Sequence, residues 1–314
     1  MEAGLSCIPG KSPYAMLISD VLAWHRQYPG DWKKNWQLLH DKWDKDDVCP
    51  TGALVDYNID AKLNGGFIAL GLLYGESDFF KTIDIATRSG QDSDCNPASA
   101  GGIVGVLLGY EAIPDQSKGG IPAIADKKFQ FTDFSFRTIV ESTEKRALEL
   151  IRATGGRVEQ DRVVVRLQAP RQPKLEIWNP GKPVERIRTS DARWTWKGAW
   201  EEREGKRRDG SPRGVKTSST KDSEAWIEFQ GRGVVISGSY LPTGGTADVY
   251  LDGKLNRRID VYSDNDGVRE GNNAIRHTWG LKNGKHSVRL VVRGEPFRDS
   301  KGSAVSIDDA IIFR

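Results

Sequence analysis

The sequence predicts a helical domain followed by an antiparallel β-sandwich. Apolar residues recur every three or four positions up to about residue 156, as on the buried face of a helix. From about residue 192 they recur at every second position, as on the buried face of a strand. We therefore expect a helical domain over 1–156, a linker with a short strand over 157–191, and the sandwich over 192–314.

The composition is that of a globular protein. The 314 residues are 38% hydrophobic and 28% charged, which is enough apolar material for two folded cores. No apolar run reaches the roughly 18 residues of a membrane span, and the N-terminus has no secretory signal pattern. The 3 cysteines, Cys7, Cys49 and Cys95, show neither a disulfide framework nor zinc spacing.

Charge is divided unevenly between the two halves. Residues 1–156 hold 16 Lys and Arg against 21 Asp and Glu, a net charge of −5, and the remainder carries +8. A basic half can favour an anionic partner. Much of this charge lies in the segment 203–213, where no aromatic residue is interleaved, so we interpret it as a solvated loop and expect no nucleic-acid partner.

Capping residues set the expected helix starts in the first half. Ser12, Asp31 and Asp78 each precede an apolar stripe at helical spacing. A last, long helix is expected to start at Thr132 or Asp133 and to run through Ile151. The other predicted helices span about 13–22, 32–43, 61–73, 79–86 and 96–110. Tryptophans that share one side of the second helix are interpreted as packing rather than as a sugar platform: Trp32, Trp36 and Trp43.

The second half alternates apolar and polar residues in short runs. These runs lie at 225–229, 233–237, 247–251, 286–292 and 305–313. Asp252-Gly253 and Asn283-Gly284 are pairs favoured in two-residue hairpin turns, so each predicts a hairpin. Many short strands with regular turns indicate a sandwich.

The segment 88–105 carries the residues best suited to chemistry. Asp92 and Asp94 lie at i and i+2, and in an extended loop both carboxylates can point to one side. Such oxygen ligands suit a hard cation such as Mg²⁺. Glycines in the helix that follows indicate that another backbone or a ligand approaches closely. The alternative is a capped helix in a tight bundle, with both aspartates merely solvated.

This segment resembles a known family. Gly90-Gln-Asp-Ser-Asp-Cys-Asn, with Gly109-Tyr-Glu-Ala-Ile-Pro after it, resembles the last motif of the ADP-ribosylglycohydrolases. Members are all-α enzymes with two metal ions, Mg²⁺ or Mn²⁺, that hydrolyse the glycosidic bond between ADP-ribose and a side chain. The resemblance covers roughly residues 1–153 and implies that Asp92 and Asp94 are metal ligands. Cys95 stands where the family has a threonine ligand, and a thiol is a poor ligand for a hard cation.

The resemblance also implies an incomplete domain. The family's other metal half-site, a Ser/Thr-Asp-Asp motif, lies upstream of this region, and Asp46-Asp47 does not match its setting. We therefore expect the chain to be the C-terminal part of a longer domain, with no catalytic residue assigned. Residues that could face the same cleft are candidates for substrate binding: Asn58, Asp60, Asn64 and Asn96. For Asp60 the alternative is capping of the third helix.

The second half resembles a galactose-binding-like β-sandwich with a jelly-roll fold, of the kind appended to secreted carbohydrate-active enzymes. The segments that carry this resemblance are Trp194-Thr-Trp-Lys-Gly-Ala-Trp, Ala247-Asp-Val-Tyr-Leu-Asp-Gly and Ile307-Asp-Asp-Ala-Ile. Such modules bind sugars by aromatic stacking, or act only as spacers. Trp194, Trp196 and Trp200 are the candidate sugar platform, and core packing is the alternative.

Together the resemblances imply a metal-dependent hydrolase of a glycosidic bond. The expected substrate is an ADP-ribosylated molecule or a carbohydrate, and the expected cofactor is Mg²⁺ or Mn²⁺, with two ions in a complete domain. The alternative is a non-catalytic carbohydrate-binding protein in which the sandwich binds and the helical half is a scaffold.

Overall fold

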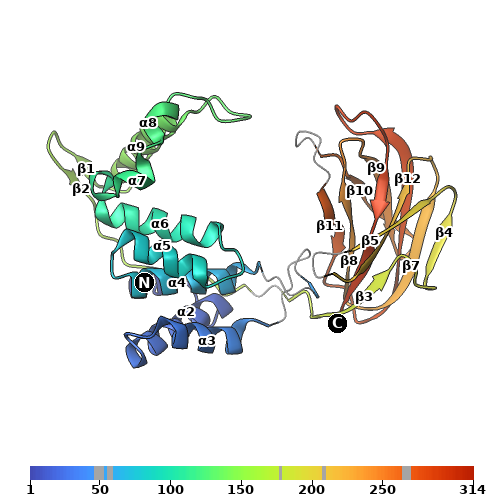
Figure 1. The fold of residues 1–314 in the computed structure, drawn as a ribbon, viewed down its shortest axis with the longest axis horizontal. Coiled ribbons are helices and arrows are strands. Elements are labelled where there is room, and N and C mark those ends of the chain that lie inside the picture. Colours follow the sequence, from blue (N-terminus) through green and yellow to red (C-terminus); the bar gives the residue numbers. More distant parts are fainter. Residues whose placement is uncertain (46–52, 55–58, 177–178, 207–209, 264–269) are drawn as a thin grey trace. The chain divides into compact units, whose positions relative to one another are not determined.

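A computed structural model describes residues 1–45, 53–54, 59–176, 179–206, 210–263 and 270–314 (Figure 1). The chain divides into two compact units, Met1–Leu39 with Gly65–Glu176, and His40–Asn64 with Ile177–Arg314. Helices build the first unit and antiparallel sheets build the second. The predicted fold class, a helical region followed by an antiparallel β-sandwich, is therefore confirmed.

The helices begin where the capping residues predicted, with one exception. Ser12 accepts a hydrogen bond from the Ala15 N–H at 3.2 Å, and Asp78 accepts one from the Lys81 N–H at 2.7 Å. The long helix was predicted to start too early, because Ser135 rather than Thr132 or Asp133 caps it. The helices are α1 (Glu2–Leu5), α2 (Pro13–Gln27), α3 (Trp32–Trp43), α4 (Ala61–Gly75), α5 (Phe79–Arg88), α6 (Cys95–Leu108), η1 (Tyr110–Ala112), α7 (Asp115–Lys118), α8 (Ile121–Ile124) and α9 (Phe136–Ala153).

The core of the first unit lies among α2, α3, α4 and α5. Leu17, Leu39 and Phe67 are fully buried there. A buried polar contact ties three of these helices together, because the Asn35 amide donates to the Val21 carbonyl at 3.0 Å and to the Tyr74 hydroxyl at 3.2 Å. After α9 the chain forms a short hairpin of β1 (Arg157–Val158) and β2 (Val163–Val164). None of the helices described is long and apolar enough to cross a bilayer.

The second unit packs a five-stranded sheet, in the order β10-β9-β12-β7-β4, and a four-stranded sheet, in the order β11-β8-β14-β3, around one core. A third sheet has the order β13-β6-β5. The strands are β3 (Pro183–Arg188), β4 (Trp194–Lys197), β5 (Glu201–Lys206), β6 (Pro212–Ser218), β7 (Glu224–Gly231), β8 (Gly233–Tyr240), β9 (Gly245–Leu251), β10 (Lys254–Asp260), β11 (Glu270–Thr278), β12 (Gly284–Pro296), β13 (Val305–Ile307) and β14 (Asp309–Phe313).

Of the two predicted hairpin turns, the structure contains one and not the other. Asp252-Gly253 joins the antiparallel strands β9 and β10, and both residues have the positive φ of a two-residue hairpin turn, 49° and 78°. Asn283-Gly284 does not form a hairpin. The strand before it, β11, pairs with β8, whereas β12 pairs with β7 and β9, so the chain crosses here from one sheet to the other.

Two features of the second unit were not predicted. Strand β3 lies inside the segment expected to be a linker, and it pairs with the last strand of the chain, β14. Ala53 is fully buried against Val235, Ile311 and Phe313. This alanine belongs to the segment between α3 and α4, so residues from the first half of the sequence help to complete the β unit.

Candidate metal centre

A tight turn places the two aspartates of the motif. Gly90 and Gln91 have positive φ angles of 91° and 55°, a conformation that reverses the chain after α5 and that glycine adopts without strain. Helix α6 then begins at Cys95, with Asp94 as its N-cap residue. The loop was predicted to be extended, but the turn and the helix cap bring Asp92 and Asp94 together instead.

Three side chains meet at this point. One potential ligand atom from each of Asp92, Asp94 and Cys95 lies within 4.8 Å of the other two. Two oxygens bound to one Mg²⁺ lie at most about 4.2 Å apart, twice the usual bond length. Asp94 is exposed and Asp92 is partly exposed, so both carboxylates are open to solvent. Two neighbouring carboxylates of this kind are the oxygen ligands that a hard divalent cation takes.

The charges of the three groups influence one another. The hydrogen bond with the Asp92 carboxyl, together with the backbone N–H of Cys95, holds the pKa of Asp94 below its ordinary value. The same Asp92 carboxyl, by hydrogen bonding and by its charge, raises the pKa of the Cys95 thiol, and Asp94 adds to this effect. Cys95 therefore stays a neutral thiol near neutral pH, which is a weak ligand for a hard cation.

Of the residues predicted to bind substrate, one caps a helix and two are buried. The Asp60 carboxylate accepts the Lys62 backbone N–H at 2.8 Å and pairs with the Lys62 ammonium at 2.8 Å, as a capping residue does. Asn64 and Asn96 are both buried, at 6% and 1% exposure. Asp60 and Asn64 belong to the second unit, whereas Asp92 belongs to the first. Asn58, like Asp46-Asp47, lies outside the described residues.

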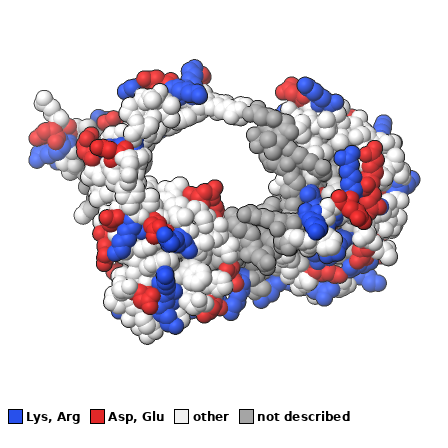
Figure 2. All heavy atoms as spheres, viewed as in Figure 1, with Lys and Arg blue, Asp and Glu red and all other residues white. Residues whose placement is uncertain are grey.

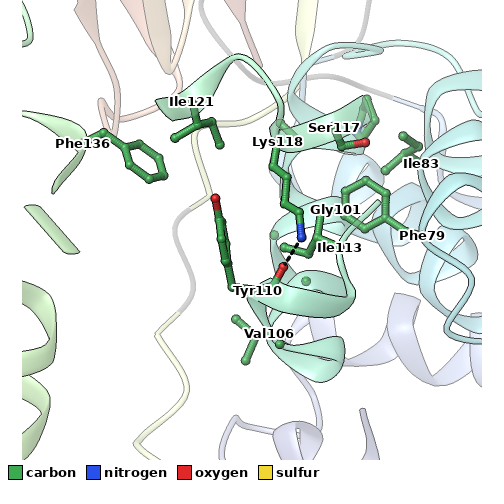
Figure 3. Close-up of a pocket in the computed structure, with 15 residues that line it drawn as sticks. Phe79, Ile83, Gly101, Val106, Tyr110, Ile113, Ser117, Lys118, Ile121 and Phe136 are labelled. Atoms are coloured by element: carbon green, nitrogen blue, oxygen red, sulfur yellow. Dashed lines mark hydrogen bonds between the residues drawn. The ribbon is translucent and has the colours of Figure 1, made fainter. Parts of the chain in front are cut away.

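An open pocket of about 730 Å³ runs along α6 (Figure 3). Its lining begins at Pro97 and Ala98, in the helix turn that follows the aspartates. The glycines of α6 have two roles. A Cβ on Gly101 would lie 3.2 Å from Ile83, so this glycine permits close packing, whereas a Cβ on Gly102 would meet nothing within 4 Å. The glycine-rich face therefore packs on one side and leaves space for the pocket on the other.

The remaining lining is apolar apart from a few groups. Phe79, Tyr110 and Phe136 contribute aromatic rings, and Figure 3 shows the Tyr110 ring extending toward Ile121 and Phe136. The Lys118 ammonium donates to the Tyr110 carbonyl at 3.0 Å and so joins α7 to η1. Sequence reasoning missed these lining residues because they come from five separate elements, with no spacing that unites them.

The predicted tryptophan platform lies mainly on the inner side of the five-stranded sheet. Trp194 is 6% exposed and belongs to the sandwich core, with its ring 5.1 Å from that of Trp196. Trp196 and Trp200 pack against the same core and are partly buried. Trp194 therefore has almost no surface to offer a sugar, while a role for the other two stays a prediction.

Comparison with known proteins supports the motif resemblance. Residues 2–154 match the family model described as ADP-ribosylglycohydrolase, which confirms the resemblance seen around the two aspartates. This match covers the helical part of the chain. A search of curated proteins found no match.

Several solved structures resemble the chain weakly. A family 35 carbohydrate-binding module from Clostridium thermocellum is 12% identical with a TM-score of 0.30, over 42% of this chain and 99% of that one. A two-domain esterase active on acetylated mannans is 13% identical with a TM-score of 0.33, over 69% and 60%. A cycloisomaltooligosaccharide glucanotransferase of Paenibacillus sp. is 11% identical with a TM-score of 0.29, over 41% and 18%. The chain thus spans less than a fifth of the glucanotransferase, and similarities this weak carry no argument about function.

Proposed function

We propose that the helical region is the metal-binding part of a glycosidic-bond hydrolase of the ADP-ribosylglycohydrolase type. The observation that carries the proposal is the meeting of the Asp92 and Asp94 carboxylates at the start of α6, beside the first residues of the apolar pocket. The family match over residues 2–154 supports the same class of reaction.

Asp92 and Asp94 would hold Mg²⁺ or Mn²⁺ through carboxylate oxygens. When bound, such an ion would supply the positive charge that orients a substrate hydroxyl and a water at the anomeric carbon. The sulfur of Cys95 is the third atom of the cluster, and it suits this role less well than oxygen. None of the described residues is assigned as the catalytic acid or base.

The pocket favours one kind of substrate. A bare sugar carries hydroxyl groups that need hydrogen-bond partners when they leave water. The pocket offers mostly methylene groups, aromatic rings and glycine backbone, with Ser117 and Lys118 among its few polar side chains. This lining suits a flat or apolar part of a substrate, such as a nucleobase, better than it suits a glycan chain. An ADP-ribosyl group is accordingly the preferred substrate class.

Metal binding tests the site directly. Mn²⁺ added to the full chain should bind, as followed by the electron paramagnetic resonance of the free ion. Asp92→Asn and Asp94→Asn should each weaken binding at least roughly tenfold, since each removes a charged oxygen ligand. Asp84→Asn is a matched control, because Asp84 is an exposed acid of α5 paired with Arg88. Equal binding by the control and both site variants would refute the metal centre.

Replacement of the thiol provides a test in the opposite direction. Cys95→Thr supplies a hydroxyl oxygen at the same exposed position, so Mn²⁺ and Mg²⁺ should bind more tightly. A soft ion such as Cd²⁺ should instead bind more weakly to this variant. If Cys95→Thr changes the affinity for Mn²⁺ and the affinity for Cd²⁺ in the same direction, Cys95 is not part of the metal site.

The hydrolase proposal needs a separate test. Release of ADP-ribose from an ADP-ribosylated peptide should be assayed, with and without Mg²⁺, in a protein that joins these residues to the family's other metal half-site; there it should depend on the metal and should be lost in Asp92→Asn. If Mn²⁺ does not bind and no substrate is cleaved, while the chain still binds a polysaccharide, the alternative of a non-catalytic carbohydrate-binding protein holds.

A further inference from the structure

A row of side chains crosses the outer face of the five-stranded sheet. Trp226 of β7 lies directly opposite Arg289 of β12, and Arg289 lies directly opposite Tyr250 of β9. Residues directly opposite each other in an antiparallel pair project from the same face of the sheet. Their sequence neighbours Ile227, Leu290 and Val249 belong to the sandwich core, so the row faces away from it.

Two of the three side chains of the row are stacked on each other. The Arg289 guanidinium lies over the Tyr250 ring, 4.4 Å from its centroid, which is a cation–π contact. Trp226 is 40% exposed on the neighbouring strand. Single exposed apolar side chains are common on proteins. An indole ring beside a stacked Arg–Tyr pair, held by three adjacent strands of a rigid sheet, is a more specific arrangement.

The charges around the row are paired with one another. Arg289 lies 3.4 Å from Glu224, and the same glutamate pairs with Lys197 at 3.4 Å. On the Tyr250 side, Asp248 pairs with both Arg258 and Arg293 at 2.8 Å. Figure 2 shows positive and negative side chains intermixed on the visible face of this unit. Glu295 also pairs with Arg293 at 2.8 Å, and Glu228 lies on the same face of β7 as Trp226. The acids Glu224, Asp248, Glu295 and Glu228 thus offset the cations Lys197, Arg289, Arg258 and Arg293, so the surface suits a neutral ligand better than a polyanion.

We propose that Trp226, Arg289 and Tyr250 form a binding surface for a neutral saccharide. The apolar face of a pyranose ring would stack on the Trp226 indole, whose ring gives contact area without a hydrogen-bonding demand. The Arg289–Glu224 pair places a donor and an acceptor beside that ring for the sugar hydroxyls. A protein partner would be expected to cover a contiguous apolar patch, whereas Glu224, Glu228 and Thr195 border Trp226 and Arg289 separates it from the Tyr250 ring.

The register explains why sequence reasoning chose other tryptophans. Trp194 and Trp196 of β4 lie opposite Ile227 and Ala225, which are core residues, so both indoles face inward. Trp226 lies opposite Thr195, the residue between them, and so faces outward. Among the described residues, the tryptophan that the sandwich exposes most therefore lies on the other side of the same sheet.

Affinity electrophoresis of the full chain tests the surface. Separate gels would contain β-glucan, xylan or galactomannan as neutral probes, with alginate and duplex DNA as polyanions. At least one neutral polysaccharide should retard the protein. Trp226→Ala should weaken the apparent Kd roughly 5- to 150-fold, the range for loss of one stacking ring. Trp226→Tyr should retain part of the binding.

Matched variants make the outcome decisive. Val184 of β3 is 45% exposed and belongs to the four-stranded sheet, so Val184→Ala removes exposed apolar surface outside the row without removing a ring. This variant should bind like the unchanged protein, and thermal unfolding would confirm that all variants fold. The proposal is overturned if no neutral polysaccharide retards the chain, if only alginate or DNA does, or if Trp200→Ala abolishes binding while Trp226→Ala does not.

Discussion

The β-sandwich and the last helix of the helical unit bury their apolar residues very differently. Strand β7 alternates strictly, with Ala225, Ile227 and Phe229 all at 5% exposure or less and the residues between them more accessible. Helix α9 has 18 residues and an apolar stripe, yet none of its side chains is buried. A hydrophobic period therefore identifies which side of an element can be buried, but it does not show that a partner covers that side.

The largest expected effect lies at a buried ion pair of the sandwich. Asp309 is 0% exposed, and its carboxylate accepts hydrogen bonds from Arg186, at 2.8 Å, and from the Ser237 hydroxyl. Arg186→Leu should lower the free energy of unfolding by about 3–5 kcal/mol, because it leaves a buried charge unpaired. Chemical denaturation followed by circular dichroism measures this loss.

The control for that change is an ion pair of the helical unit. Arg137 pairs with Asp126 at 2.7 Å, but both side chains are mostly exposed. Arg137→Leu should change stability little, since water replaces the lost contact. If both substitutions cost the same, burial is not what separates the two units.

Truncation of one apolar side chain to alanine in each unit should show the same difference in unfolding free energy. Ile227 is 1% exposed in the sandwich core, so Ile227→Ala should cost about 2–5 kcal/mol of unfolding free energy. Leu150 of α9 is 64% exposed, and Leu150→Ala should stay within about 0.5 kcal/mol of the unchanged protein. Urea titration of both variants measures the difference. A large loss in Leu150→Ala would show that α9 is covered in solution.

Local sequence signals predicted the parts of the fold that depend on local chemistry. The caps at Ser12 and Asp78 and the hairpin at Asp252-Gly253 need only a few neighbouring residues, and the structure contains all three. The failure at Asn283-Gly284 is instructive, because the turn pair is favourable but the partners of its flanking strands are chosen by the two sheets.

In the candidate sites, too, contacts between near neighbours in the sequence were predictable, whereas features set by strand pairing were not. Asp92 and Asp94 are two positions apart, so their meeting could be predicted from the sequence, although the turn that achieves it was not. The ring of Trp226 could not be assigned, because a one-residue difference in register decides whether a strand residue faces the core or the solvent.

Two glycines provide a third comparison, now within the helical unit. A Cβ on Gly75 would lie 2.1 Å from the Thr82 hydroxyl and 2.7 Å from the Thr82 Cα, so Gly75→Ala should cost about 1–3 kcal/mol. Gly102 of α6 has open space around it, and Gly102→Ala should stabilise the helix by up to about 1 kcal/mol. Thermal unfolding midpoints should therefore move in opposite directions. Equal losses would mean that the pocket side of α6 is tightly packed.

The smallest expected effect is a pH-dependent contact at one end of the sandwich. His286 lies between two acceptors, because Nδ1 is 2.8 Å from the Asp252 carboxylate and Nε2 is 2.8 Å from the Lys282 carbonyl. Partial burial alone would lower the pKa of His286, but these hydrogen bonds outweigh it and raise the pKa above its ordinary value. Burial would likewise raise the pKa of Asp252, yet its bonds to His286 and to the Ser287 N–H lower it.

The contact between His286 and Asp252 should therefore stabilise the fold fully only between a lower and an upper pH. The histidine contribution is complete below the unfolded pKa of about 6.5 and is lost as the pH rises through the raised pKa of the folded state. The aspartate contribution is present above its unfolded pKa of about 3.9 and is lost as the pH falls through the lowered pKa of the folded state.

Between about pH 4 and 6.5, His286→Gln should thus melt at a lower temperature than the unchanged protein. Above the raised pKa that gap should narrow, because the neutral ring can donate to only one of the two acceptors. A gap of constant size from pH 5 to pH 9 would mean that His286 acts by packing against Phe229, its ring neighbour at 5.7 Å, rather than by its charge.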